Sequence, residues 1–198
     1  MSGVKRTLTA ERLRAALNTS ILAKERFVER HGTTLLELGE GLAKRLSYGA
    51  KLLIAGNGGS ATDAQHFAAE LVGRFSKVRG PLPCLALPAN MGLLTAIGND
   101  FGFERVFERQ IEAFGRKEDA FLAISTSGNS TNIVLAAQRA RELGLFVVGL
   151  TGFGGGALKE HAHVLLDLPF EAETPRVQET HIFALHALAW IIEESFVR

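Results

Sequence analysis

The chain has 198 residues, a length that favours a single domain spanning 1–198. Apolar residues make up 46% of it and charged residues 22%, and 22 Lys and Arg against 21 Asp and Glu leave a net charge of +1, so we expect no nucleic-acid partner. Because no apolar segment is long enough to span a bilayer or to form the core of a signal peptide, we expect no membrane association and a cytoplasmic location. The one cysteine, Cys84, lies in an apolar run and fits a reduced core thiol.

The N-terminal quarter predicts a pair of helices, about residues 8–31 and 33–48, separated near His31-Gly32-Thr33. Both have apolar residues at helical spacing: Leu13, Leu17, Ile21, Leu22 and Phe27 in the first, and Leu35, Leu36, Leu38, Leu42 and Leu46 in the second. Catalytic residue types are sparse here, and the two apolar stripes need a surface to cover them. We therefore expect residues 8–48 to pack against a partner subunit.

Apolar runs of strand length alternate with helical patterns from residue 51 to residue 168. The expected strands are Lys51–Ala55, Cys84–Leu87, Ala120–Ile124, Phe146–Leu150 and Val164–Leu168, and the expected helices cover 60–75, 91–97, 104–114, 131–143, 157–161 and 175–196. This alternation predicts an α/β fold: a doubly wound five-stranded parallel sheet flanked by helices, with the N-terminal helical pair and a long C-terminal helix. Ligands of such sheets bind at the carboxyl ends of the strands.

A glycine-rich turn, Gly56-Asn57-Gly58-Gly59, follows the first strand. Ser60 with Asp63 then predicts a capping box at the start of the next helix. Glycines let a ligand approach the backbone, and the free N–H groups of a first helical turn favour an anion. The turn therefore predicts a site for a phosphorylated metabolite.

A hydroxyl-rich loop, Ser125–Ser130, lies between the third strand and its helix. Its four hydroxyls exceed what a helix cap needs, so phosphate binding is favoured over a simple polar turn. The segment Thr151–Gly156 holds a similar place with fewer donors, and we interpret it as a structural turn.

Two pairs of residues carry possible chemistry on helices. His66 and Glu70 are four residues apart, so they project side by side from one face. Each alone is more often a structural histidine or a solvated charge, and their spacing is a weak metal signal, but a phosphate turn precedes them. On the last helix, His186 stands in an apolar run where an imidazole needs a partner, and Gln178 lies ~12 Å along the helix and about 80° around it. These two side chains could converge on one ion.

Four segments together resemble the phosphoheptose isomerases of the sugar-isomerase (SIS) domain class: AGNGGSATDAQHFAAELVGRF, LTAIGNDFGFERVF, AISTSGNS and TPRVQETHIFALHAL. The resemblance extends from about residue 8 to the end of the chain. It implies a five-stranded parallel sheet, a homotetramer with sites at subunit boundaries, and interconversion of sedoheptulose 7-phosphate and D-glycero-D-manno-heptose 7-phosphate. That reaction is the first step of ADP- or GDP-heptose biosynthesis, which feeds lipopolysaccharide.

The resemblance also implies one Zn²⁺ per subunit, with metal ligation by His66, Glu70, Gln178 and His186. Glu70 and His186 fit the catalytic base and acid of an enediol mechanism, in which protons move between C1 and C2 and between their oxygens. A zinc-bound carboxylate is a poorer base, so Glu70 holds both roles only with a change in coordination. The implied substrate contacts are Asn57, Gly58, Gly59, Glu70, Asn99, Asp100, Ser125, Thr126, Ser127, Ser130 and Gln178.

Three alternatives stay open. Many members of the resembling family carry Asp-x-Ser where this chain has Asn90-Met91-Gly92, which keeps isomerisation of another sugar phosphate open. A non-catalytic adapter of the same fold that associates with a replication initiator lacks an acidic residue at the position of Glu70, so Glu70 argues against that function. A sugar-phosphate-sensing regulatory module is the third alternative, but no DNA-binding domain accompanies the chain.

Overall fold

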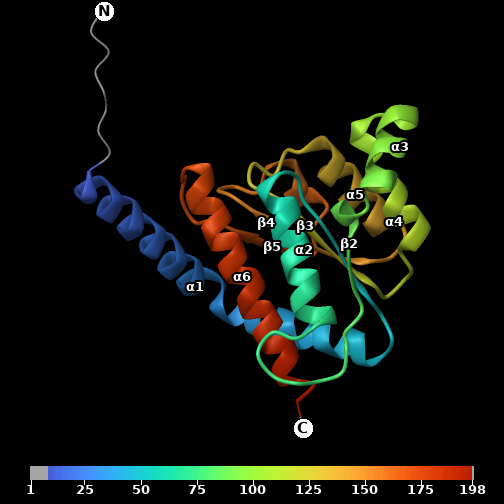
Figure 1. The fold of residues 1–198 in the computed structure, drawn as a ribbon, viewed down its shortest axis with the longest axis horizontal. Helices are drawn as coiled ribbons and strands as arrows, with labels where there is room; N and C mark the ends of the chain where they lie inside the picture. Colours follow the sequence, from blue (N-terminus) through green and yellow to red (C-terminus); the bar gives the residue numbers. More distant parts are fainter. Residues whose placement is uncertain (1–8, 198) are drawn as a thin grey trace, which may run out of the picture.

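A parallel sheet forms the middle layer of the protein, whose computed structural model describes residues 9–197. Within this range the sheet has five strands in the order β2-β1-β3-β4-β5, and every neighbouring pair is parallel. Their bounds are β1 Leu52–Ala55, β2 Cys84–Ala86, β3 Ala120–Ser125, β4 Phe146–Thr151 and β5 Val164–Asp167. Parallel neighbours need crossover connections, and the alternating helices supply them (Figure 1). The predicted five-stranded parallel sheet is confirmed.

Helices cover both faces of the sheet. One face is packed by α1 (Ala10–Ser47), α2 (Gly59–Val72) and α6 (Thr174–Glu194). The other is packed by α3 (Met91–Phe101), α4 (Glu108–Phe114) and α5 (Thr131–Glu142). Short 3₁₀ helices at Leu87–Ala89, Phe103–Arg105 and Gly156–Glu160 complete the connections. The fold is therefore doubly wound, as the alternation of elements predicts.

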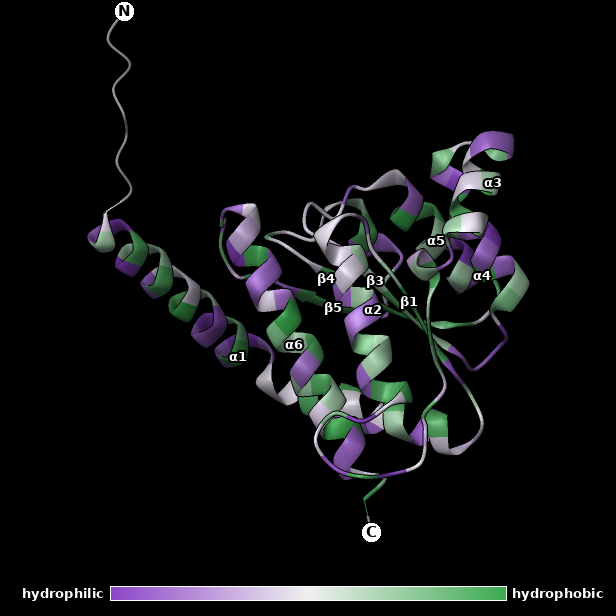
Figure 2. Ribbon diagram, viewed as in Figure 1, coloured by the Kyte–Doolittle hydropathy of each residue, from purple (hydrophilic) through white to green (hydrophobic). Residues whose placement is uncertain are grey.

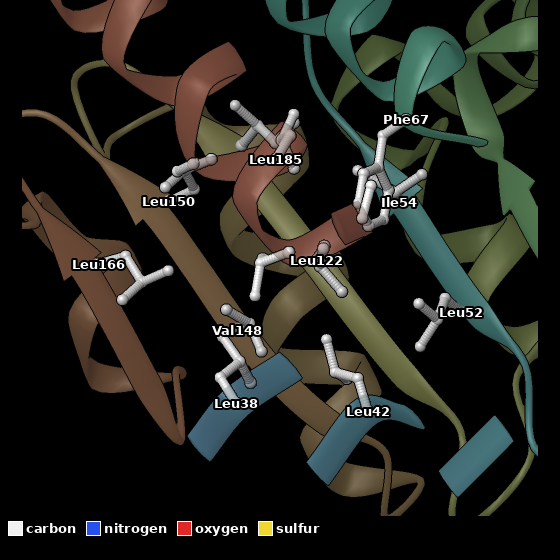
Figure 3. Close-up of a cluster of buried hydrophobic side chains, with 14 of the residues drawn as sticks. Leu38, Leu42, Leu52, Ile54, Phe67, Leu122, Val148, Leu150, Leu166 and Leu185 are labelled. Carbon is white, nitrogen blue, oxygen red and sulfur yellow. The ribbon is translucent and has the colours of Figure 1, made fainter. Parts of the chain in front are cut away.

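Strand side chains alternate between two apolar cores because successive residues of a strand point to opposite faces. Leu52 and Ile54 of β1 enter the cluster beneath α1, α2 and α6, whereas Leu53 enters the cluster beneath the other helices. Figure 3 shows Leu122 and Val148 from adjacent strands in the first cluster, which also contains α1 residues. Since both faces of the strands are buried, their sequences are continuously apolar rather than alternating.

The N-terminal segment is one helix, so the prediction of a helical pair with a break near His31 is wrong. α1 runs without interruption from Ala10 to Ser47, and Gly32 lies within it. His31 is buried, and its Nε2 lies 2.9 Å from the backbone oxygen of Asp167, at the end of β5. A glycine inside a helix costs only about 1 kcal/mol, which packing of this kind can offset.

Other helix boundaries differ from the predictions too; for example, α4 begins at Glu108 and not at Glu104, and α2 ends at Val72 and not at Phe75. α2 starts at Gly59, so its N-cap residue is Gly58, which has no side chain that could cap the helix. Ser60 lies buried in the first turn. The predicted capping box is therefore wrong. α3 continues to Phe101, past the predicted end at Gly98. Asn90 caps that helix, because its side-chain oxygen accepts a hydrogen bond from the N–H of Leu93 at 3.1 Å.

Cys84 is a free, partly buried cysteine on β2. Burial raises the pKa of its thiol to about 12, so the thiolate form is negligible near neutral pH. No helix within residues 9–197 is long and apolar enough to cross a bilayer.

Candidate active site

The candidate site lies where α2 packs beside α6, on one side of the sheet (Figure 1). Gly59, Asp63, His66 and Glu70 follow one another along α2 at spacings of four, three and four residues, which places them on one helical face. Two residues of α6 contact this face of α2, one at the N-terminal end of α2 and one farther along it. Gln178 packs against Gly59 so closely that a Cβ there would lie 2.6 Å from its Nε2, and His186 meets His66 farther along. A larger residue at position 59 would therefore displace the amide end of Gln178.

Three of the predicted metal-ligand residues converge. The Nε2 atoms of His66 and His186 are 2.9 Å apart, and Nε2 of His66 lies 3.3 Å from Oε1 of Glu70. One ligand atom from each residue lies within 4.8 Å of the other two. The side chain of His66 is 48% exposed and that of Glu70 is 19% exposed, so the cluster is open to solvent.

The donor set of this cluster fits a divalent cation. Two imidazole nitrogens and one carboxylate oxygen are ligand types found in protein zinc sites, which take three or four such donors. Gln178, the fourth predicted ligand, packs against Gly59 at the start of α2. His66, Glu70 and His186 therefore form a possible metal-binding group, brought together from two helices.

Asp63 belongs to the same helical stripe, although sequence reasoning assigned it only to a cap. Burial raises the pKa of its carboxyl group, and the nearby His66 and His186 counter part of that rise. The signal that would have found it is its position three residues before His66, on the face that carries Glu70.

The Ser125–Ser130 loop follows β3 at its carboxyl end. The hydroxyl of Ser125 donates to that of Ser130 at 3.0 Å, and Ser127 Oγ accepts from the N–H of Asn129 at 3.1 Å. Gly128 has a positive φ of 67°, and a Cβ there would lie 2.1 Å from the backbone oxygen of Gly155. The loop after β4 therefore supports the hydroxyl-bearing loop by direct backbone contact, in agreement with its interpretation as a structural turn.

A reciprocal amide pair holds the glycine-rich turn to α5. Asn57 donates from Nδ2 to Oδ1 of Asn132 at 2.9 Å, and Asn132 donates back to Asn57 at the same distance. Asn132 is buried, whereas Asn57 is partly exposed. Sequence reasoning missed Asn132 because nothing local distinguishes it from an ordinary residue in the first turn of a helix.

Two predicted site residues do not join the cluster in this chain. Asn99 and Asp100 lie near the end of α3, are exposed, and hydrogen-bond each other at 2.8 Å. Figure 1 shows α3 at the periphery, on the side of α2 away from α6.

The two histidines of α6 lie in different settings. His181 is fully buried, and within the described residues neither ring nitrogen makes a hydrogen bond. Burial lowers the pKa of His181 to about 4, an effect that the neighbouring backbone of Thr151 reduces. His186, which lies in the apolar run, is only partly buried and has His66 as its partner.

Comparison with known proteins assigns the chain to a protein family. The family model for the SIS domain matches residues 17–152, which include β1, α2 and the Ser125–Ser130 loop. The matched residues contain strands β1 to β4 and the loops that follow β1 and β3.

Relatives narrow the class further. The chain is 48% identical over 170 residues to the phosphoheptose isomerase of Nitratidesulfovibrio vulgaris, covering 86% of this chain and 81% of the relative. The structure of the phosphoheptose isomerase of Neisseria gonorrhoeae superposes with a TM-score of 0.86 at 40% identity, covering 93% and 98% of the two chains. That of Francisella tularensis gives a TM-score of 0.90 at 33% identity, covering 95% and 100%. The chain belongs to the SIS domain family and, within it, to the phosphoheptose isomerases.

Proposed function

We propose that the chain isomerises sedoheptulose 7-phosphate to D-glycero-D-manno-heptose 7-phosphate through an enediol, with the residues and the metal assigned below. The observation that carries these assignments is the convergence of His66, Glu70 and His186, three proton-transfer or ligand groups, from two helices. Membership of the phosphoheptose isomerases supplies the substrate class.

The substrate phosphate is assigned to the loop after β3. Between the carboxyl end of β3 and the N-terminus of α5, hydroxyl groups are supplied by Ser125, Thr126, Ser127 and Ser130. Hydroxyls and backbone N–H groups at such a helix end favour an anion without needing a cation. Asn57, Gly58 and Gly59, at the carboxyl end of the neighbouring strand β1, are assigned to the sugar.

Proton transfer is assigned to Glu70 and His186. The carboxylate of Glu70 takes a proton from one of the carbons C1 and C2 and returns it to the other, while His186 exchanges protons with their oxygens. Each step needs a group that can both accept and release a proton, as these two side chains can.

The metal is assigned as one Zn²⁺ held by His66, Glu70, Gln178 and His186. When bound, zinc would act as a Lewis acid for the negative charge that develops on the substrate oxygens. Glu70 is both a proposed ligand and the proposed base, and binding to zinc weakens its basicity. The carboxylate of Glu70 also lies 3.3 Å from Nε2 of His66, another proposed ligand.

The proposed assembly is a homotetramer. The N-terminal half of α1 projects from the rest of the protein, and hydrophobic residues alternate with hydrophilic ones along it (Figures 1 and 2). Leu13 and Leu17 are each 57% exposed, which supports a partner surface covering this helix. Asn99 and Asp100 would contact substrate at a subunit boundary. A cytoplasmic location stays a prediction.

Proton NMR of the purified protein with sedoheptulose 7-phosphate tests the reaction directly. We expect the anomeric proton signal of an aldose to grow with enzyme concentration, and to vanish with the Glu70→Gln variant. Fructose 6-phosphate serves as the matched ketose control, with slower conversion expected. Faster conversion of fructose 6-phosphate would assign the site to another sugar phosphate, and no conversion of either would favour a non-catalytic protein of this fold.

A further inference from the structure

A buried carboxylate at the end of α6 organises the loop that leaves α2. Glu193 accepts hydrogen bonds from the backbone N–H of Phe75 at 2.9 Å, of Ser76 at 2.8 Å and of Lys77 at 2.9 Å. Ser76 adds its hydroxyl at 2.8 Å. Burial by itself would raise the pKa of Glu193, but these donors lower it to about 2, so the carboxylate is charged near neutral pH.

Arg79, in the same loop, caps the C-terminal end of α2 with its buried guanidinium group. Nη2 of Arg79 donates to the backbone oxygen of Glu70 at 2.7 Å, and Nη1 donates to that of Leu71 at 2.8 Å. These carbonyls belong to the last turn of the helix, where no intrahelical N–H reaches them. Nε of Arg79 lies 3.4 Å from Oε1 of Glu193, a charge contact without an aligned hydrogen bond. Both side chains are 1% exposed.

The two charges thus connect the helices that carry the proposed metal ligands. Arg79 contacts the backbone of Glu70 itself, and Glu193 lies seven residues beyond His186 on α6. The ring of Phe75, whose N–H is bound by Glu193, also packs on His186 with centroids 5.7 Å apart. A buried ion pair adds little to stability compared with apolar packing. We therefore expect the Arg79–Glu193 pair to have a role at the proposed ligands that lie next to it.

We propose that Arg79 and Glu193 are positioning residues for the metal centre, which hold the Glu70 carboxylate and the His186 imidazole at ligand distance. This inference rests on the proposed metal-dependent function. Groups that orient metal ligands commonly change metal affinity when they are altered, even though they do not touch the ion.

Metal affinity of the full-length protein is the measurement that tests this. Metal-free wild type and Glu193→Gln are titrated with Co²⁺ by visible absorption and with Zn²⁺ against a chromophoric chelator. We expect Glu193→Gln to bind roughly 10- to 100-fold more weakly, since one oxygen that accepts backbone N–H groups becomes an amide donor. Glu194→Gln is the matched control, because the neighbouring Glu194 pairs with exposed Lys77 and should leave affinity unchanged.

The variant Leu158→Ala distinguishes a loss of positioning from a general loss of stability, because it leaves a cavity in the core on the opposite face of the sheet. With its melting temperature lowered to a similar degree, this variant should keep wild-type affinity. If Glu193→Gln does not fold, Arg79→Lys takes its place, because lysine keeps the charge but cannot reach both carbonyls with a fork of donors. If neither folds, hydrogen exchange on the wild type decides: bound metal should slow the amides of Phe75–Lys77.

Wild-type affinity in a folded Glu193→Gln or Arg79→Lys variant would overturn the positioning role and leave the metal centre standing. Equal weakening by Leu158→Ala, or unchanged exchange at residues 75–77, would also overturn it. A wild-type protein that binds neither Co²⁺ nor Zn²⁺ would instead refute the proposed metal centre, and the positioning role with it.

Discussion

His66 and His186 face each other with their Nε2 atoms 2.9 Å apart, although 120 positions separate them in the chain. One ring stands on α2 and the other on α6, and their centroids are 5.1 Å apart in an edge-on arrangement. Two nitrogens this close can share a proton or a cation. The group that completes the cluster, Glu70, is therefore the most informative position to change.

Replacing Glu70 with glutamine keeps the size of the side chain and one oxygen, but removes its ability to take a proton. We expect kcat to fall by about 10²- to 10⁴-fold, the usual worth of general base catalysis, with the fold and assembly retained. Steady-state kinetics and metal analysis of the same preparations make the measurement. Glu112→Gln is the control, because it makes the same chemical change on α4, where Glu112 pairs with Arg139.

The metal content of Glu70→Gln separates its two proposed roles. Retained zinc with no recovery of activity on adding zinc would identify Glu70 as the base, which is our expectation. Lost zinc with partial recovery in excess zinc would identify it chiefly as a ligand. Wild-type turnover would contradict both roles.

Removing the hydroxyl of Ser127 tests the phosphate loop. Ser127 is exposed and its Oγ only accepts a local N–H from Asn129, so Ser127→Ala should leave stability nearly unchanged. A phosphate contact is shared by the ground state and the transition state, so KM should rise more than kcat falls. Ser47→Ala, at the far end of α1, is the control. A fall in kcat at constant KM would instead place Ser127 in the chemical step.

Introducing a charge on α1 tests the assembly. Leu17 is 57% exposed, and Leu17→Glu should convert the tetramer to smaller species if partner subunits cover this helix. Val78→Glu is the matched control, because Val78 is 85% exposed on the loop after α2. Light scattering at micromolar concentration makes the comparison. A wild-type mass of 21.4 kDa, that of one chain, would contradict the assembly.

Burial of His181 predicts a specific pH dependence of stability. Its pKa is lowered from 6.5 to about 4 in the folded protein, so between these values the unfolded chain binds the proton and the folded chain does not. The free energy of unfolding therefore falls as the pH decreases from about 6.5 to about 4, and this contribution is fully present above 6.5.

The variant His181→Leu should show a smaller decrease across that interval, because it lacks the proton that destabilises the wild type. Denaturant unfolding at a series of pH values measures the two slopes. His161→Leu, at a partly exposed histidine, should keep the wild-type slope. Equal slopes for wild type and His181→Leu would show that His181 is not buried in its neutral form.

Local patterns in the sequence determined most of the fold. Apolar runs such as Phe146–Leu150 predicted their strands, because a strand buried on both faces is apolar throughout. The alternation of strands and helices predicted the doubly wound sheet. His66 and Glu70 were recognisable because residues four apart share a helical face. These features depend only on neighbours along the chain.

Tertiary packing decided what no local pattern contains. α1 continues through Gly32, where a break was predicted, and His31 beside it contacts Asp167 at the end of β5. Asn132 pairs with Asn57, and Glu193 binds the backbone of Phe75, across 75 and 118 positions of the chain. Helical periodicity tells which residues share a face, but not what lies opposite that face. The contacts of Asn57 with Asn132 and of His66 with His186 join residues 75 and 120 positions apart, and only the folded chain brings these residues together.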